Sequence, residues 1–129
     1  MKRFAVSVEP PGSGVRRLSV QGEIDRSTVD VVRREANRQI ELHGPRLVLD
    51  LVRTSFMDSS GLHLIEALRR RTSEQGGSLV LVVATYGVRR LLEIAPPRSD
   101  VLVVVARSER DAAITHARLS PQSGQTVAA

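Results

Sequence analysis

Five short segments of the chain carry the apolar pattern of β-strands. Phe4, Val6 and Val8 alternate along the first segment, as in a strand with one buried face. The later segments are almost continuously aliphatic and rich in β-branched residues, which is typical of strands inside a sheet. The five segments are residues 4–8, 15–20, 46–51, 79–83 and 101–105. A break rich in proline and glycine separates the first two, which are predicted to form an antiparallel hairpin.

Four segments between and after these strands repeat apolar residues at helical spacing. The first places Val29, Val32, Ala36 and Ile40 on one stripe, and Ser27 is its predicted N-cap. Glycine or proline pairs follow the first three helices and are expected to end them. The other three helices are predicted at residues 62–71, 88–95 and 108–118.

The order of these elements predicts the fold. Short connections between strands and helices imply parallel neighbours with right-handed crossovers. If successive strands step the same way across the sheet, all helices pack on one face. We therefore predict a single α/β domain over residues 1–118, with a mixed, mostly parallel sheet of about five strands and about four helices mainly on one face. A disordered tail is predicted over residues 119–129, and the less covered sheet face favours a partner protein or a homodimer.

Composition narrows the functional classes. The chain has 129 residues and no cysteine, which excludes a disulfide framework and thiolate chemistry. No charged-then-apolar leader opens it and no apolar run is long enough to cross a bilayer, so a cytoplasmic protein without membrane insertion is expected. The net charge is +5, but the arginines are scattered and aromatic residues make up only 2% of the chain. Direct nucleic-acid binding is therefore not expected.

The candidate chemistry lies in residues 55–62, between a predicted strand and a predicted helix. Ligands and partners are commonly met at such turns of α/β folds. A nucleophilic Ser59 or Ser60 would need a histidine base, and His63 is close in sequence. However, the Gly-x-Ser-x-Gly pattern and an evident oxyanion hole are absent, and His43 and His116 lie elsewhere in the chain. The protein is therefore not expected to be an enzyme.

A metal site is also not expected. Asp25, Asp50 and Asp58 lie near predicted strand ends and could converge on a Mg²⁺ ion, but each also suits a structural role in a turn, a strand end or a helix cap. The three histidines show no ligand spacing, and glycine-rich phosphate loops are missing. No cofactor is therefore predicted.

Two interpretations of the serines remain open on physical grounds alone. In the first, Ser59 is a substrate for phosphorylation, because a helix start favours a negative charge and can accept a phosphate without melting. Asp58 opposes that charge by repulsion, so the modification would change the surface rather than the folding. In the second, Asp58, Ser59 and Ser60 only cap the helix, since such residues are preferred there.

A resemblance to a known family favours the first interpretation. The motif Phe56-Met57-Asp58-Ser59-Ser60-Gly61-Leu62 resembles the phosphorylation motif of bacterial anti-sigma factor antagonists, whose fold is the STAS domain. Three further stretches are similar to other parts of that family, and the likeness covers about residues 4–118. These stretches are Gly22-Glu23-Ile24-Asp25, Gly76-Gly77-Ser78-Leu79 and Val88-Arg89-Arg90-Leu91-Leu92.

The resemblance implies a partner-switching function. The unmodified antagonist binds an anti-sigma factor that is also a serine kinase, which frees a sigma factor for transcription. The kinase then phosphorylates the serine after the aspartate, here Ser59, and a metal-dependent serine phosphatase reverses the reaction. ATP and Mg²⁺ belong to these partners. The implied contact residues are Asp25, Ser27, Asp58, Ser60, Gly61 and His63, and Gly61 is expected to let the kinase approach closely.

Two departures from the family pattern bear on partner choice. His63 occupies a position where the family often has a second glycine, and Ala95-Pro96-Pro97-Arg98 replaces a common Ser/Thr-Gly-Leu element. A second function is compatible with the same fold, namely a STAS interaction subunit that is not phosphorylated, such as that of a lipid-transport ABC complex.

Overall fold

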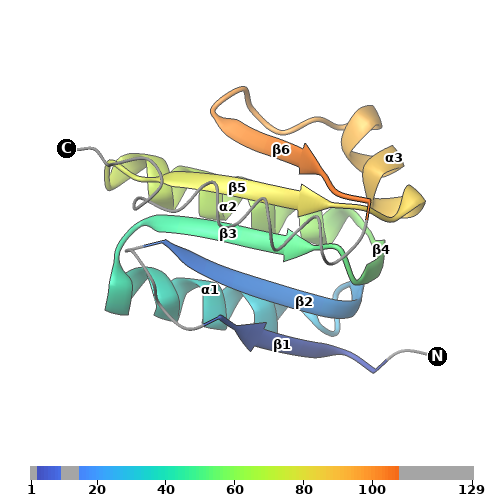
Figure 1. Ribbon diagram of the computed structural model, residues 1–129, viewed down its shortest axis with the longest axis horizontal. Coiled ribbons are helices and arrows are strands. Elements are labelled where there is room, and N and C mark those ends of the chain that lie inside the picture. Colours follow the sequence, from blue (N-terminus) through green and yellow to red (C-terminus); the bar gives the residue numbers. More distant parts are fainter. Residues whose placement is uncertain (1–2, 10–14, 108–129) are drawn as a thin grey trace.

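A six-stranded sheet and three helices make up the part of the chain that the computed structural model describes, residues 3–9 and 15–107 (Figure 1). The strands are β1 (Ala5–Val8), β2 (Arg16–Ile24), β3 (Arg46–Leu51), β4 (Thr54–Met57), β5 (Ser78–Val83) and β6 (Val101–Val105). The helices are α1 (Val29–His43), α2 (Ser59–Glu74) and α3 (Tyr86–Ile94). The predicted class, a mostly parallel α/β sheet in one domain, is confirmed.

The strands follow the order β1-β2-β3-β5-β6 across the sheet. β1 and β2 form the predicted antiparallel hairpin, and the other neighbours are parallel. Each crossover through a helix therefore steps in the same direction, and a right-handed step of this kind puts the three described helices on the same side. Figure 1 shows α1 and α2 side by side behind the sheet. The one-sided layer agrees with the prediction.

The main core lies between the helices and the strand faces turned towards them. Its fully buried residues include Leu18 on β2, Leu49 on β3, Leu81 on β5 and Leu64 on α2. The core is almost entirely aliphatic, as the scarcity of aromatic residues requires. A second, smaller cluster lies on the opposite sheet face and consists of Val15, Val48, Val52, Val82 and Ala106.

One strand was not predicted. β4 comes from residues expected to form a turn, and it pairs in parallel with the second half of β2, whose first half pairs with β3. The short β3–β4 connection is held by hydrogen bonds: the amide of Val52 donates to Asp50 Oδ1 at 2.9 Å, and the amide of Gly22 donates to the carbonyl of Arg53 at 3.1 Å. The hydroxyl of Thr54 donates to the carbonyl of Val20 at 2.8 Å. These contacts hold the connection in the position that lets β4, which follows β3 in the chain, pair with β2.

Helix boundaries also differ from the sequence pattern. α1 follows Thr28 rather than the predicted cap Ser27, because residues 25–28 form a turn of their own before the helix. α2 begins at Ser59, three residues before the first apolar position of its stripe. The predicted fourth helix at residues 108–118 and the predicted tail at residues 119–129 lie outside the described residues.

Candidate functional site

Two neighbouring parallel strands bring the predicted site residues together. β2 ends at Ile24 and β4 ends at Met57, and these two residues are paired in register. Asp25 and Asp58 follow directly, and the amide of Asp58 donates a hydrogen bond to the carbonyl of Ile24 at 3.2 Å. Because parallel strands end at the same edge of a sheet, the loop before α1 and the start of α2 lie next to each other.

Asp58 is the N-cap of α2. Its backbone is extended, and its Oδ1 accepts hydrogen bonds from the amide of Ser60 at 2.9 Å and from the hydroxyl of the same residue. Its carbonyl accepts from the amide of Gly61 at 3.0 Å. These bonds satisfy two amides of the first helical turn, which otherwise lack partners.

The two serines of the motif are in different states. Ser60 is half-buried and its hydroxyl is bound to Asp58. Ser59 is exposed, and within residues 3–9 and 15–107 its hydroxyl has no hydrogen-bond partner. Of these two hydroxyls, only that of Ser59 can react or bind without first breaking a contact among the described residues.

Asp25 organises the neighbouring loop in a similar way. Its Oδ1 accepts hydrogen bonds from the amide and hydroxyl of Ser27, at 2.9 and 2.6 Å, and from the amide of Thr28 at 3.2 Å. These bonds stabilise the ionised form and lower the pKa of Asp25 below its ordinary value, the hydroxyl of Ser27 contributing most and the Ser27 amide next. A carboxylate therefore faces the site at neutral pH.

Gly61 supports the site from the inside. It is buried in the first turn of α2, and a Cβ atom on it would lie 2.2 Å from Cγ and 2.5 Å from Sδ of Met57. The absent side chain thus makes room for Met57, which anchors the end of β4 in the core. This inward packing differs from the surface role that the resemblance implied for Gly61.

His63 lies on the exposed surface of α2, four residues after Ser59 and so on the same helix face. His43 is the last residue of α1, where partial desolvation and then the charges of Arg16 and Arg38 lower its pKa. His116 lies outside the described residues. Of the two histidines in the described residues, His63 is the one that lies near the serines.

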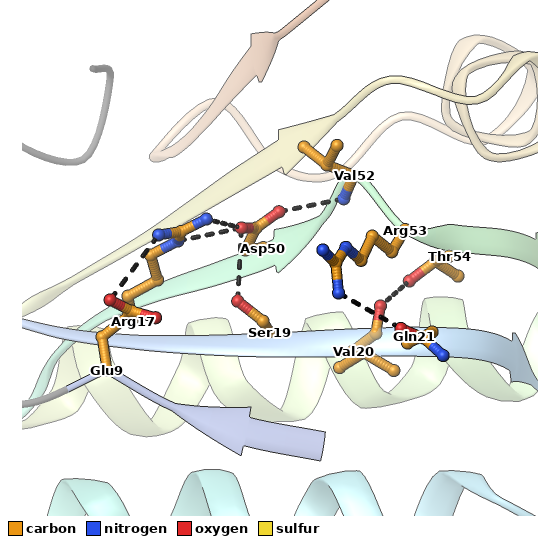
Figure 2. Close-up of polar contacts among 9 residues, drawn as sticks. All are labelled: Glu9, Arg17, Ser19, Val20, Gln21, Asp50, Val52, Arg53 and Thr54. Carbon is orange, nitrogen blue, oxygen red and sulfur yellow. Dashed lines mark hydrogen bonds and ion pairs between the residues drawn. The ribbon is translucent and has the colours of Figure 1, made fainter. Parts of the chain in front are cut away.

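The three aspartates considered for a metal do not converge. Asp50 points to the sheet face opposite the helices, where its Oδ2 accepts hydrogen bonds from Arg17 Nε at 2.8 Å and from the hydroxyl of Ser19 at 3.3 Å (Figure 2). Asp25 and Asp58 are committed to their turns. In the part of the chain that is described, no group of three acidic or histidine side chains could hold a metal ion.

Two exposed aromatic residues near the site were not singled out by the sequence pattern. Phe56 on β4 is 47% exposed, and Tyr86 at the start of α3 is 77% exposed. The start of α3 is held against β4 by a 2.7 Å hydrogen bond from the hydroxyl of Thr85 to the carbonyl of Thr54. Two of the three aromatic residues of the chain are thus exposed beside the site, and the sequence pattern gave no signal for this exposure.

Comparisons with known proteins identify the family. The model of the family described as "STAS domain" matches residues 11–112. The chain belongs to the STAS domain family, as the motif predicted, and is related within it to anti-sigma factor antagonists. It is 32% identical over 83 residues to an anti-sigma F factor antagonist from Paenibacillus polymyxa, which is 64% of this chain and 71% of that protein.

Solved structures support the same assignment. A crystal structure of an anti-sigma factor antagonist from Mycobacterium paratuberculosis superposes with a TM-score of 0.74 at 25% identity, covering 90% of this chain and 95% of the other. The Bacillus protein SpoIIAA in its phosphorylated form superposes with a TM-score of 0.65 at 23% identity, covering 88% and 100%. At that identity the second likeness concerns the fold. Within the described residues, no helix is both long enough and apolar enough to cross a membrane.

Proposed function

We propose that this protein is an anti-sigma factor antagonist whose binding to an anti-sigma factor is switched off by phosphorylation of Ser59. The single observation that carries the proposal is the difference between adjacent hydroxyls: Ser59 is exposed and Ser60 is bound to Asp58. The membership of the STAS family and the relatives named as anti-sigma factor antagonists support it.

The proposed contact surface surrounds Ser59. It is made by the two loops that follow β2 and β4 and by the first turn of α2. Its members are Asp25, Ser27, Asp58, Ser60 and His63. In this proposal Gly61 takes part indirectly, because its packing against Met57 fixes the start of the helix on which Ser59 stands.

Phosphorylation changes this surface without a change of fold. The phosphoryl group adds about two negative charges to Ser59. The amides and dipole at the start of α2 stabilise such a charge by about 0.3–1 kcal/mol, whereas Asp58 opposes it by repulsion. The domain therefore stays folded, and the partner meets a strongly negative group where it had met a neutral hydroxyl. This is a binding switch rather than a folding switch.

The chemistry of the switch is supplied by partner proteins. The anti-sigma factor acts as a serine kinase that transfers the γ-phosphoryl group of ATP to Ser59 Oγ; the hydroxyl proton passes to a base of the kinase and ADP leaves. Loss of the complex returns the anti-sigma factor to its sigma factor. A serine phosphatase then hydrolyses the ester and restores the hydroxyl.

The test is incubation with the cognate anti-sigma factor kinase and ATP, with the modified residue located by mass spectrometry. The label is expected on Ser59 and absent from Ser59→Ala, which still binds the kinase. Ser60→Ala is the matched control for the position of the label: Ser60 lies in the proposed contact surface, so the amount of label can change, but the label it accepts is expected on Ser59. Label on Ser60, or label that persists in Ser59→Ala, would overturn the assignment.

A second experiment separates binding from folding. Ser59→Asp is expected to lose binding to the anti-sigma factor while its melting temperature stays close to that of the parent. If instead the protein co-purifies with a permease and an ATPase and with no kinase, the proposed function is wrong and the protein is a STAS subunit of a transport complex.

A further inference from the structure

The outer edge of β6 is an unpaired strand edge within the described residues 3–9 and 15–107. The amide of Ala106 donates to the carbonyl of Val83 on β5 at 2.8 Å. In a parallel strand, alternate residues direct both their N–H and C=O groups to the same neighbour. The peptide groups of Val103 and Val105 therefore point away from β5, as donors and acceptors for another strand.

This edge lacks the usual protection against pairing. Natural edge strands prevent association with charged residues, prolines or bulges. β6 has none of these, because it consists of five consecutive aliphatic residues in regular pairing with β5. Leu102 is 50% exposed on the face opposite the helices, and Val105 is 56% exposed on the helix face. Beside it runs a groove of about 310 Å³ whose apolar walls include Leu92, Pro96 and Val103.

We propose that β6 pairs with β6 of a second copy of this chain, in antiparallel orientation around a two-fold axis at Val103. The two Val103 residues then exchange two hydrogen bonds, and the amide of each Val105 donates to the carbonyl of Val101 in the other copy. The amide of Val101 is not needed, because it already donates to the carbonyl of Arg98 at 3.0 Å. The sheets of the two copies become continuous.

The same register also places aliphatic side chains opposite one another. Residues opposite each other in a sheet point to the same face. Pairing around Val103 places Leu102 opposite Val104 on one face and Val105 opposite Val101 on the other, so every cross-strand pair is aliphatic. A shift by a single residue would place side chains of opposite faces against each other, which pairing does not allow. The strand is therefore complementary to itself in this register.

Charge and position favour a second copy over an unrelated strand. The acidic residue Asp100 comes just before β6; it pairs with Arg69 of α2 at 3.2 Å, and its side chain is still 48% exposed. A basic residue, Arg107, comes shortly after the strand. Antiparallel pairing brings the acidic end of each strand beside the basic end of the other, and a two-fold axis makes both contacts at once. β3 and β5 separate β6 from β2, so Ser59 remains accessible in the dimer.

The test is the mass of the full chain by light scattering, from low micromolar to millimolar concentration, together with amide hydrogen exchange. A weak dimer is expected because one paired strand buries a small area. In the dimer the amides of Val103 and Val105 should become protected as concentration rises, while that of Ala106 is protected throughout by β5. A chain that stays monomeric at millimolar concentration overturns the proposal.

Two variants assign the contact. Val103→Pro removes an amide that faces away from β5, so the monomer should keep its fold while the dimer loses two hydrogen bonds and its dissociation constant rises about thirtyfold. Val103→Thr keeps the amide and the branched shape and should still form the dimer. A dimer of unchanged affinity in folded Val103→Pro would overturn the proposal. So would protection of the Val103 amide that appears only when another protein is added. If Val103→Pro does not fold, the concentration dependence of amide exchange in the parent protein is the test.

Discussion

The carboxylate of Asp58 holds Ser60 by two atoms, its amide at 2.9 Å and its hydroxyl, and so leaves the adjacent Ser59 without a partner among the described residues. The side chain of Asp58 thus caps α2 and also binds the hydroxyl of Ser60, while the hydroxyl of Ser59 stays exposed to solvent. The same interaction links the stability of the helix to the availability of the proposed phosphorylation site.

The cap predicts a measurable loss of stability when Asp58 is changed. Asp58→Ala removes the acceptor for the amide of Ser60 and should lower the free energy of unfolding by about 1 kcal/mol, as is usual for an N-cap. Asp58→Asn keeps an oxygen at the same position and should unfold within a few tenths of a kcal/mol of the parent. Denaturant unfolding measures both, and an equal loss in the two variants would contradict the capping role.

The loop before α1 predicts a pH effect. The pKa of Asp25 lies below its ordinary value of 3.8, chiefly because of the hydrogen bonds from Ser27. The lowered pKa means that the folded state favours the carboxylate; the stabilisation is full above the ordinary value and is lost as pH falls through the folded pKa. An NMR titration of the Asp25 carboxyl group should give a midpoint below 3.8.

The matched variant for this measurement is Ser27→Ala. It removes the hydroxyl that contributes most to the lowered pKa, so the midpoint of Asp25 should move back towards 3.8. The Asp25→Asn variant should show a flatter dependence of melting temperature on pH in this acidic range. A midpoint that stays unchanged in Ser27→Ala would contradict the assigned cause.

The sequence predicted the layers of the fold because they depend on local patterns. The stripe of Val29, Val32 and Ala36 and the aliphatic strand runs each report their own element, and the short connections then determine the handedness. β4 was missed because it has only four residues, with burial at both ends and exposure in the middle rather than alternation. Its strand character depends on pairing with β2, which is distant in the sequence.

The site was predictable in place but not in detail. The motif predicted that Ser59 stands at a helix start, and the family resemblance distinguished it from Ser60. The hydrogen bond that holds the Ser60 hydroxyl is visible only in the structure. The packing of Gly61 against Met57 also depends on the angle between β4 and α2, which no local pattern encodes. The contact between Arg17 and Asp50 joins residues 33 positions apart and shows no sequence signal.

The close packing of Gly61 predicts that a side chain at this position destabilises the fold, and Gly87 offers a control position in another helix. Gly61→Ala would bring Cβ to 2.2 Å from Met57 Cγ, so the start of α2 or the side chain must move, and stability should fall by about 1–3 kcal/mol. Gly87 lies in α3, and a Cβ there meets nothing closer than the carbonyl of Ser55 at 3.6 Å. Gly87→Ala should therefore be neutral or stabilising by about 0.5–1 kcal/mol, as alanine favours helices. Thermal unfolding compares the two, and equal effects would contradict the packing role.

The ion pair between Arg17 and Asp50, on the sheet face opposite the helices, predicts the largest loss of stability. The side chains of Arg17 and Asp50 are 13% and 5% exposed, and Asp50 also accepts from the amide of Val52, which begins the connection to β4 (Figure 2). Asp50→Ala leaves a partly buried guanidinium without its main partner and loosens that connection, so about 3 kcal/mol of stability should be lost.

A surface ion pair supplies the comparison for Asp50. Asp30 and Arg33 are paired on α1 with side chains 64% and 38% exposed, and Asp30→Ala should cost no more than about 1 kcal/mol, including the loss of a charge near the helix start. Because the connection after Asp50 delivers β4 to β2, Asp50→Ala should also raise hydrogen exchange at the amide of Asp58, which is bonded to Ile24. Asp30→Ala should leave that amide protected. Equal exchange at the amide of Asp58 in the parent and in both variants would show that the contacts of Asp50, on the sheet face opposite the helices, do not support the serine site.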